Sequence, residues 1–211
     1  MLEIIRAAGW PIYFLLLASV ISLALIIERA ISLRRSVIVP PGFLEKLIGE
    51  LRQGGVSDDL VKRVHAHSPL GRVLAAGLRN VRSTREVMKE SIEEAGRAVA
   101  HDLERFLTTL GTIATVSPLM GLFGTVIGMI ELFGAQNPTG GGTDPQQLAH
   151  GISVALYNTG FALMIAIPSL IAYRHYRAQV DSIILDMEQQ AIRLVDVIHG
   201  ERRTAPSKQE R

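Results

Sequence analysis

Three apolar segments, each long enough to cross a lipid bilayer, constrain the fold of this chain more than any other feature. They run from about Trp10 to Ile27, from about Phe106 to Phe133, and from Gly151 to Tyr173. A helix needs about 20 apolar residues to cross the roughly 30 Å of hydrocarbon. Because backbone polar groups in lipid must bond within their own element, we expect three membrane-spanning helices.

The first apolar segment has two possible interpretations, a cleaved signal peptide or a retained membrane span. Its apolar run is longer than that of a usual signal peptide, and no A-x-A cleavage motif follows it. The basic stretch "ERAISLRR" comes directly after it. These features favour a retained span.

Lysine and arginine are distributed unevenly, and their distribution predicts the orientation. Residues 34–105 contain 13 of them and residues 174–211 contain seven, whereas residues 134–150 contain none. Because positively charged loops stay on the cytoplasmic side, we expect the N-terminus outside and the C-terminus in the cytoplasm. In chain order we expect a short periplasmic N-terminus (1–9), transmembrane helix one (10–32), a cytoplasmic helical region (33–105), transmembrane helix two (106–133), a periplasmic loop (134–150), transmembrane helix three (151–173), a cytoplasmic helix (174–199) and a disordered tail (200–211).

Both later spans are expected to continue as helices into the cytoplasm. Ser83 and Glu86 have the spacing of a capping box, and no strong helix breaker follows before Pro118. One helix is therefore predicted from about Thr84 to Phe133. The third span continues into a stretch with an apolar helical stripe: Val180, Ile183, Ile184, Met187, Ile192 and Val195. The expected fold class is an all-α membrane protein with three transmembrane helices, the second and third extended into a cytoplasmic helical stalk.

The sequence offers no catalytic or metal-binding constellation. It contains no cysteine, and its six histidines lack the spacing of metal ligands. No nucleophile and base stand at a characteristic spacing. We therefore expect neither an enzyme nor a bound metal or cofactor.

The three apolar segments carry no ionisable residue in their middle, although such a residue is the usual mark of a proton path. Glu28 and Glu131 lie near the ends of the first and second segments. If this protein moves protons, the titrating group must come from another chain.

Small residues gather on one face of the second span. Gly121, Gly124 and Gly128 fall within about 60° of arc on a helix. Such a face lets membrane helices approach closely, and we expect it to pack against another helix. Pro118, and Pro168 in the third span, are interpreted as kinks or packing adjustments, since membrane helices tolerate proline.

A comparable stripe on the third span comprises Ala155, Thr159, Ala162 and Ala166. Thr159 and Thr125 each lie about eight residues inside the outer end of their span, roughly 12 Å below the surface. Two interpretations remain open. Each threonine could merely bond its own backbone, or the two hydroxyls could form a polar ring in an oligomer.

Four arginines near the expected inner surface are candidates for contacts with anionic phospholipid head groups, although ordinary topology already accounts for them. They are Arg34, Arg35, Arg174 and Arg177.

Two long motifs resemble the paired signature of the MotA/TolQ/ExbB proton-channel family. They are "SPLMGLFGTVIGMI" in the second span and "GISVALYNTGFALMIAIPSLIAY" in the third. The order of spans, the outside N-terminus and the large loop between the first two spans match the ExbB and TolQ branches, and the third span and tail are most similar to ExbB. The resemblance covers most of the chain.

The resemblance implies a bacterial inner-membrane motor. Five copies of an ExbB-like chain would surround a pair of single-span ExbD-like helices, each bringing an aspartate. Spans two and three would line the pore, and proton motive force would do work on TonB for outer-membrane nutrient import. Thr125 and Thr159 match family threonines that face the partner aspartate, and the three alanines would line the pore beside them.

One position departs from the family pattern, because Val154 stands where some members have glutamate. The expected contribution of this chain to the proton path is then hydroxyls and water. Two other functions remain open: a TolQ-like subunit of the Tol-Pal envelope system, and a non-conducting membrane scaffold. A scaffold would tolerate valine at Thr125 and Thr159.

Overall fold

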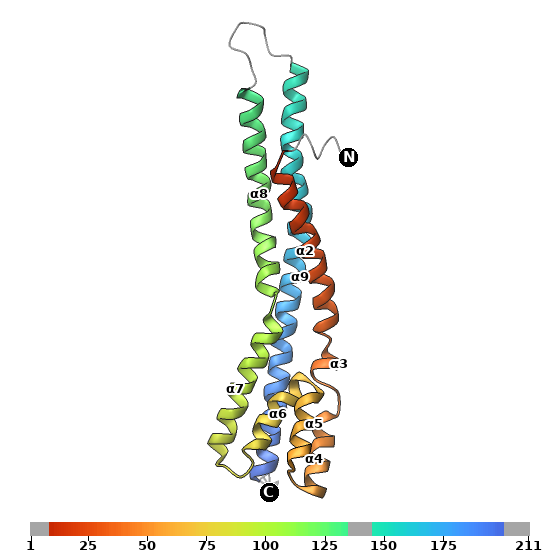
Figure 1. Cartoon of the computed structure of the whole chain (residues 1–211), viewed down its shortest axis with the longest axis vertical. Coiled ribbons are helices and arrows are strands. Elements are labelled where there is room, and N and C mark those ends of the chain that lie inside the picture. Colours follow the sequence, from red (N-terminus) through yellow and green to blue (C-terminus); the bar gives the residue numbers. More distant parts are fainter. Residues whose placement is uncertain (1–8, 135–144, 201–211) are drawn as a thin grey trace, which may run out of the picture. The chain divides into compact units, whose positions relative to one another are not determined.

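The computed structural model describes residues 9–134 and 145–200, and within them every regular element is a helix (Figure 1). The helices are α2 (Pro11–Ser32), α3 (Arg35–Ile38), α4 (Phe43–Gly54), α5 (Asp58–His67), α6 (Pro69–Arg79), α7 (Arg85–Glu104), α8 (Leu107–Gly134) and α9 (Pro145–His199). The predicted disordered tail, apart from Gly200, and most of the predicted periplasmic loop lie outside the described residues. The described end of that loop is already helical, since α9 begins at Pro145.

Within residues 9–134 and 145–200, three stretches of helix are long and apolar enough to cross a membrane. They are Pro11–Ser32, Arg85–Gly134 and Gly151–His199. Two of these continue far beyond the length that a bilayer requires. The predicted fold class, an all-α membrane protein with two extended helices, is therefore confirmed.

The chain does not form one uninterrupted helix from Thr84 to Phe133, as the sequence pattern predicted. α7 ends at Glu104, and α8 begins at Leu107. Between them Phe106 has a φ of 65°, a left-handed conformation that a bulky residue rarely adopts. The guanidinium of Arg29 lies over the Phe106 ring, 5.4 Å from its centroid. Because the interruption needs neither glycine nor proline, the sequence pattern did not predict it.

The chain divides into two compact units. We call Met1–Ala30 with Phe106–Tyr176 the membrane unit, and Ile31–Arg105 with Arg177–Arg211 the extramembrane unit. The membrane unit contains most of α2, all of α8 and the apolar part of α9. The two units are described separately below.

The membrane unit is held together by apolar packing and a few buried polar bonds. Leu15 of α2 is buried with Ala162 and Ile165 of α9. The hydroxyls of Ser22 and Ser169, both buried, form a hydrogen bond of 2.5 Å between α2 and α9. Nearer the end of α2, the Tyr176 hydroxyl donates to the backbone carbonyl of Ile26 at 3.0 Å. Polar bonds thus join α2 to α9 at two levels.

The extramembrane unit comprises α3 to α7 and the last part of α9. Ser57 and Ser68 cap α5 and α6, because their hydroxyl oxygens accept from backbone N–H groups three residues further on. The cap of α7 is Thr84, one residue after the predicted Ser83. The predicted stripe of α9 is buried at Val180, Ile183, Met187 and Val195, whereas Ile192 is exposed.

Ser22 and Ser169 are predicted to be energetically coupled. Replacing either by alanine removes the bond between α2 and α9, so each single change should lower stability by about 0.5–1.5 kcal/mol. Because both changes remove the same bond, the double variant should lose less than the sum of the two. Thermal unfolding of the purified protein in detergent measures this coupling.

Ser153→Ala is the control for this experiment, because the Ser153 hydroxyl is exposed and donates to the carbonyl of Ala149 on its own helix. It should leave stability unchanged. Strict additivity of the Ser22 and Ser169 changes would contradict the prediction.

Candidate functional site

The candidate site lies where α8 and α9 pack against each other inside the membrane unit. A side-chain Cβ placed on Gly124 would lie 2.8 Å from Nδ2 of Asn158, and one placed on Gly128 would lie 3.1 Å from Cβ of Ala155. One placed on Gly121 would overlap Cβ of Ala162. The three glycines therefore let two backbones approach more closely than any other residue would allow.

This contact lies within a single chain. The structure places α9 of the same chain against the glycine face. The close packing of neighbouring copies through these glycines, which the family resemblance implies, stays a prediction.

The contact runs antiparallel with a regular register. Near the end that leads into the 135–144 segment, Gly151 faces Leu132, and at the other end Gly111 faces the ring of Tyr173. Each step forward along α8 is matched by a step back along α9. This register places Thr125 at the level of Thr159, as their depth in the sequence predicted.

Thr125 is half-buried and bonds its own helix. Its hydroxyl donates to the carbonyl of Leu122 at 2.6 Å. One sequence interpretation predicted a bond of this kind within the helix, to the carbonyl four residues back, and the acceptor lies three residues back. The same residue lines a shallow hollow of about 470 Å³ on α8, together with Val126, Met129, Ile130 and Phe133. Thr125 is thus the polar member of an otherwise apolar surface.

Thr159 differs from Thr125 in its hydrogen bonding. Its hydroxyl oxygen is buried and has no hydrogen-bond partner among the described residues. Its Cα lies 3.0 Å from the Cβ position of Gly121, so the residue stands at the helix contact itself. The hydroxyl of Ser117 is likewise buried and without a partner in the described part of the chain.

The three alanines of the predicted pore lining lie in the interior of the chain. Ala155, Ala162 and Ala166 are 3%, 0% and 4% exposed. The first two contact the glycine face of α8. In one chain these alanines are packing residues between helices.

Pro118 and Pro168 lie inside α8 and α9, and both helices continue through them. Each proline removes one backbone donor from its helix, so one carbonyl in the preceding turn loses its usual partner. The interpretation of both residues as local packing adjustments stays a prediction.

The four arginines considered for lipid contacts have different surroundings. Arg35 forms an ion pair with Asp186, and Arg177 forms ion pairs with Glu104 at 3.3 Å and Asp181 at 3.7 Å. The other two, Arg34 and Arg174, are exposed.

Sequence reasoning did not select two buried polar residues, Arg29 near the end of the first span and Asn158 inside the third. Arg29 is 5% exposed and is hydrogen bonded to Glu28 at 2.7 Å. Asn158 is 1% exposed and lies against Gly124. An asparagine in the middle of an apolar span is a signal that the sequence did contain, since buried amides in membranes are costly.

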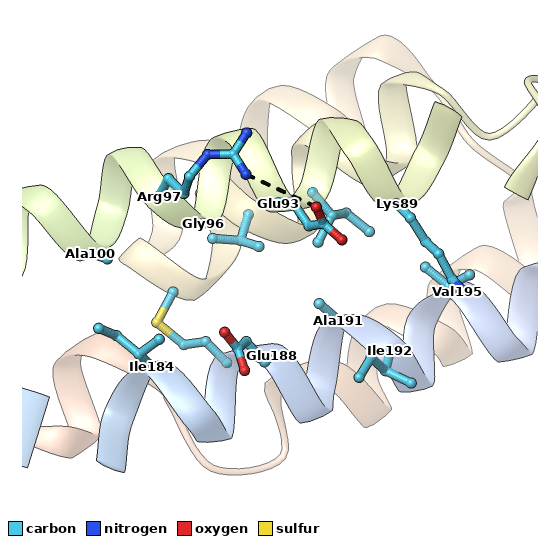
Figure 2. A pocket seen from close by; sticks show the side chains of 13 residues that line it. Lys89, Glu93, Gly96, Arg97, Ala100, Ile184, Glu188, Ala191, Ile192 and Val195 are labelled. Atoms are coloured by element: carbon cyan, nitrogen blue, oxygen red, sulfur yellow. Dashed lines mark ion pairs between the residues drawn. The ribbon is translucent and has the colours of Figure 1, made fainter. Parts of the chain in front are cut away.

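The extramembrane unit contains a hollow of about 570 Å³ between α7 and the last part of α9 (Figure 2). Most of its lining residues are apolar, Ile184 and Ala191 among them, and its charged lining residues are Lys89, Glu93, Arg97 and Glu188. No serine, threonine, tyrosine or histidine lines it. Across the described residues, no group of three or more histidine, aspartate or glutamate side chains could hold a metal ion.

Fold and site together define a class: a three-span helical membrane protein in which two closely packed helices bring hydroxyls to one level. Comparison of the sequence with known protein families identifies one of them. Residues 65–189, more than half of the chain, match the MotA/TolQ/ExbB proton channel family. The chain belongs to this family.

Similar proteins carry the names of two of the three branches of the family, ExbB and TolQ. A biopolymer transport protein ExbB homologue of Methanothermobacter thermautotrophicus is 27% identical over 188 residues, which cover 89% of this chain and 66% of the relative. The biopolymer transport protein ExbB1 of Vibrio cholerae is 28% identical over 77% of this chain and 71% of its own length. The Tol-Pal system protein TolQ of Pseudomonas aeruginosa is 28% identical over 81% of this chain and 78% of its own length.

This chain therefore spans about two thirds of the length of the first of these relatives. Its family and its three apolar helices make it an inner-membrane protein. It is a proton-channel subunit of the ExbB and TolQ kind.

Gly121→Ala should weaken the contact between α8 and α9. The added methyl would overlap Ala162, and overpacking of this kind costs about 1–3 kcal/mol. Thermal unfolding in detergent should show the loss. Gly160→Ala is the matched control, because a Cβ there meets nothing within 4 Å.

The control should be neutral or slightly stabilising, since alanine is a better helix former than glycine by about 1 kcal/mol. Equal effects of the two substitutions would contradict the role of Gly121 in close packing.

Proposed function

We propose that this chain is the channel-forming subunit of an inner-membrane motor that converts proton motive force into mechanical work. Like an ExbB protein, it would act with an ExbD-like single-span partner on a TonB-like energy transducer, and so drive nutrient import across the outer membrane. The N-terminus would be periplasmic and the C-terminus cytoplasmic, as the distribution of lysine and arginine indicates.

The observation that carries this proposal is the buried hydroxyl of Thr159 at the level of Thr125. Its oxygen has no hydrogen-bond partner among the described residues, and leaving such a group unpaired in an apolar interior is unfavourable. No ionisable residue lies in the middle of any span. A carboxylic acid supplied by a partner helix would give the Thr159 hydroxyl a hydrogen-bond partner and would provide the titrating group that the spans lack.

A homopentamer around a pair of partner helices is the proposed assembly. Thr125 lines a surface hollow, so it would face the central helices directly. Thr159 would need a rotation of its side chain to do so, because its hydroxyl points into the chain. The buried alanines of α9 would contribute by holding α8 and α9 at a fixed distance.

The proton path in this chain would use hydroxyls and water. Val154 supplies no second carboxylate, so the partner aspartate would be the one titrating group at this level. Phospholipid head groups would contact Arg34 and Arg174, which are exposed near the ends of spans one and three.

A TolQ-like role in the Tol-Pal system is a second candidate. It is favoured by the Pseudomonas aeruginosa TolQ, whose similarity covers as much of this chain as that of the Vibrio cholerae protein. Identification of the single-span proteins that co-purify with this chain would separate the two, since one role requires a TonB-like partner and the other a TolA-like partner.

Thr159→Val should abolish proton-driven work while leaving assembly intact. Valine keeps the shape of threonine and removes the hydroxyl, and a hydrogen bond to a charged group is worth enough for a loss of about tenfold or more. The measurement is uptake that depends on proton motive force, in cells that express the chain with its single-span partner. Native mass spectrometry of the complex checks assembly.

Thr159→Ser is the matched control, because it keeps the hydroxyl and should retain most of the uptake. Full uptake by an intact Thr159→Val complex would refute the assignment. It would favour a non-conducting scaffold in which Thr159 only packs.

A further inference from the structure

A buried amide lies at the same level as the two threonines, and the proposed function gives it no role. Asn158 is 1% exposed within the contact between α8 and α9. An amide in the apolar interior of a membrane protein is unfavourable unless its hydrogen-bonding groups are used. A leucine or alanine would fill the same position without that penalty. The amide therefore calls for a reason beyond filling space.

The structure provides a specific place for this side chain. A Cβ on Gly124 would lie 2.8 Å from Nδ2, 2.9 Å from Cγ and 3.0 Å from Cβ of Asn158. Any residue larger than glycine at position 124 would push the amide away. Gly124 and Asn158 thus form a matched pair, because the absence of a side chain at position 124 of α8 leaves the space that the amide from α9 occupies.

The neighbours of this pair are the residues of the proposed proton path. Thr125 follows Gly124 directly, and Thr159 follows Asn158 directly. Both Asn158 and Thr159 contact the same face of α8, the first at Gly124 and the second at Gly121. The amide consequently lies between the two helices at the level of Thr125 and Thr159.

We infer that Asn158 is a positioning residue of the proton path. Its amide sets the spacing of α8 and α9 at the level of Thr125 and Thr159 and supplies hydrogen-bonding groups there. An amide carries two donor hydrogens and an acceptor oxygen, so it can orient hydroxyls or water on either side without titrating itself. This inference rests on the proposed function, because it gives the amide a role in the same proton transfer.

Two double variants of this pair distinguish the effect of the spacing between α8 and α9 from the effect of the amide group. The double variant Gly124→Ala with Asn158→Ala refills the contact with two methyl groups and removes the amide. The double variant Gly124→Asn with Asn158→Gly moves the amide to α8 at the same level. Each is produced with the single-span partner that co-purifies with the chain, and the complex is reconstituted in phospholipid vesicles.

Proton flux is followed with a pH-sensitive dye under an imposed membrane potential. The alanine pair should assemble but conduct at least about tenfold less than the natural chain, the loss expected when hydrogen bonds to the transferring groups disappear. The transplanted amide should restore flux to within about threefold. The control is the size exchange Gly77→Ala with Ile92→Val in the extramembrane unit, where an added Cβ lies 2.8 Å from Cδ1 of Ile92 and no polar group is involved.

Asn158→Asp keeps the shape of the amide and provides a second test if the alanine pair does not assemble. A carboxylic acid at this level titrates, so the ratio of its flux to that of the natural chain should change with pH. A ratio that is constant across pH would overturn the inference, as would natural flux in the alanine pair.

The proposed function fails in a different way. If the natural chain with its partner shows no proton flux, the proton-channel role and the inference fall together. If flux is present and does not respond to the amide, only the role of Asn158 is lost.

Discussion

The close approach of α8 and α9 at three glycines is the constraint on which the rest of the membrane unit depends. Inside a bilayer, helices gain nothing from leaving water, so association depends on packing and on polar bonds. Gly121, Gly124 and Gly128 remove the side chains that would keep the backbones apart. Ala155, Ala162 and Asn158 then fill the contact from α9.

This contact also decides where polar groups can lie. With α8 and α9 in close register, the hydroxyl of Thr159 turns into the chain while Thr125 remains at the edge of a surface hollow. A second set of buried hydroxyls, Ser22 and Ser169, joins α2 to α9. Exposed hydroxyls of this unit, such as those of Thr112, Thr115 and Ser153, donate to backbone carbonyls of their own helix, which satisfies them without a second helix.

Much of the fold was predictable because the bilayer imposes a simple rule on sequence. Three apolar segments of sufficient length give three spans, and amphipathic stretches beside them give the remaining helices. The interruption at Phe106 was not predictable, because its left-handed backbone is accompanied by a tertiary contact with Arg29 and not by a local breaker. The equal depth of Thr125 and Thr159 in the membrane was predictable, because each lies about eight residues inside the outer end of its span.

The sequence by itself determined the number of spans, the family and the position of the small-residue face. Only the tertiary structure decided what that face contacts. Spacing on one helix says which residues share a face, but the partner of a face depends on the register of a second helix. In that register the glycines of α8 contact α9 of the same chain, the alanines are buried and Asn158 lies against Gly124. The reason is that two backbones can come this close only where both helices have their smallest residues at the contact.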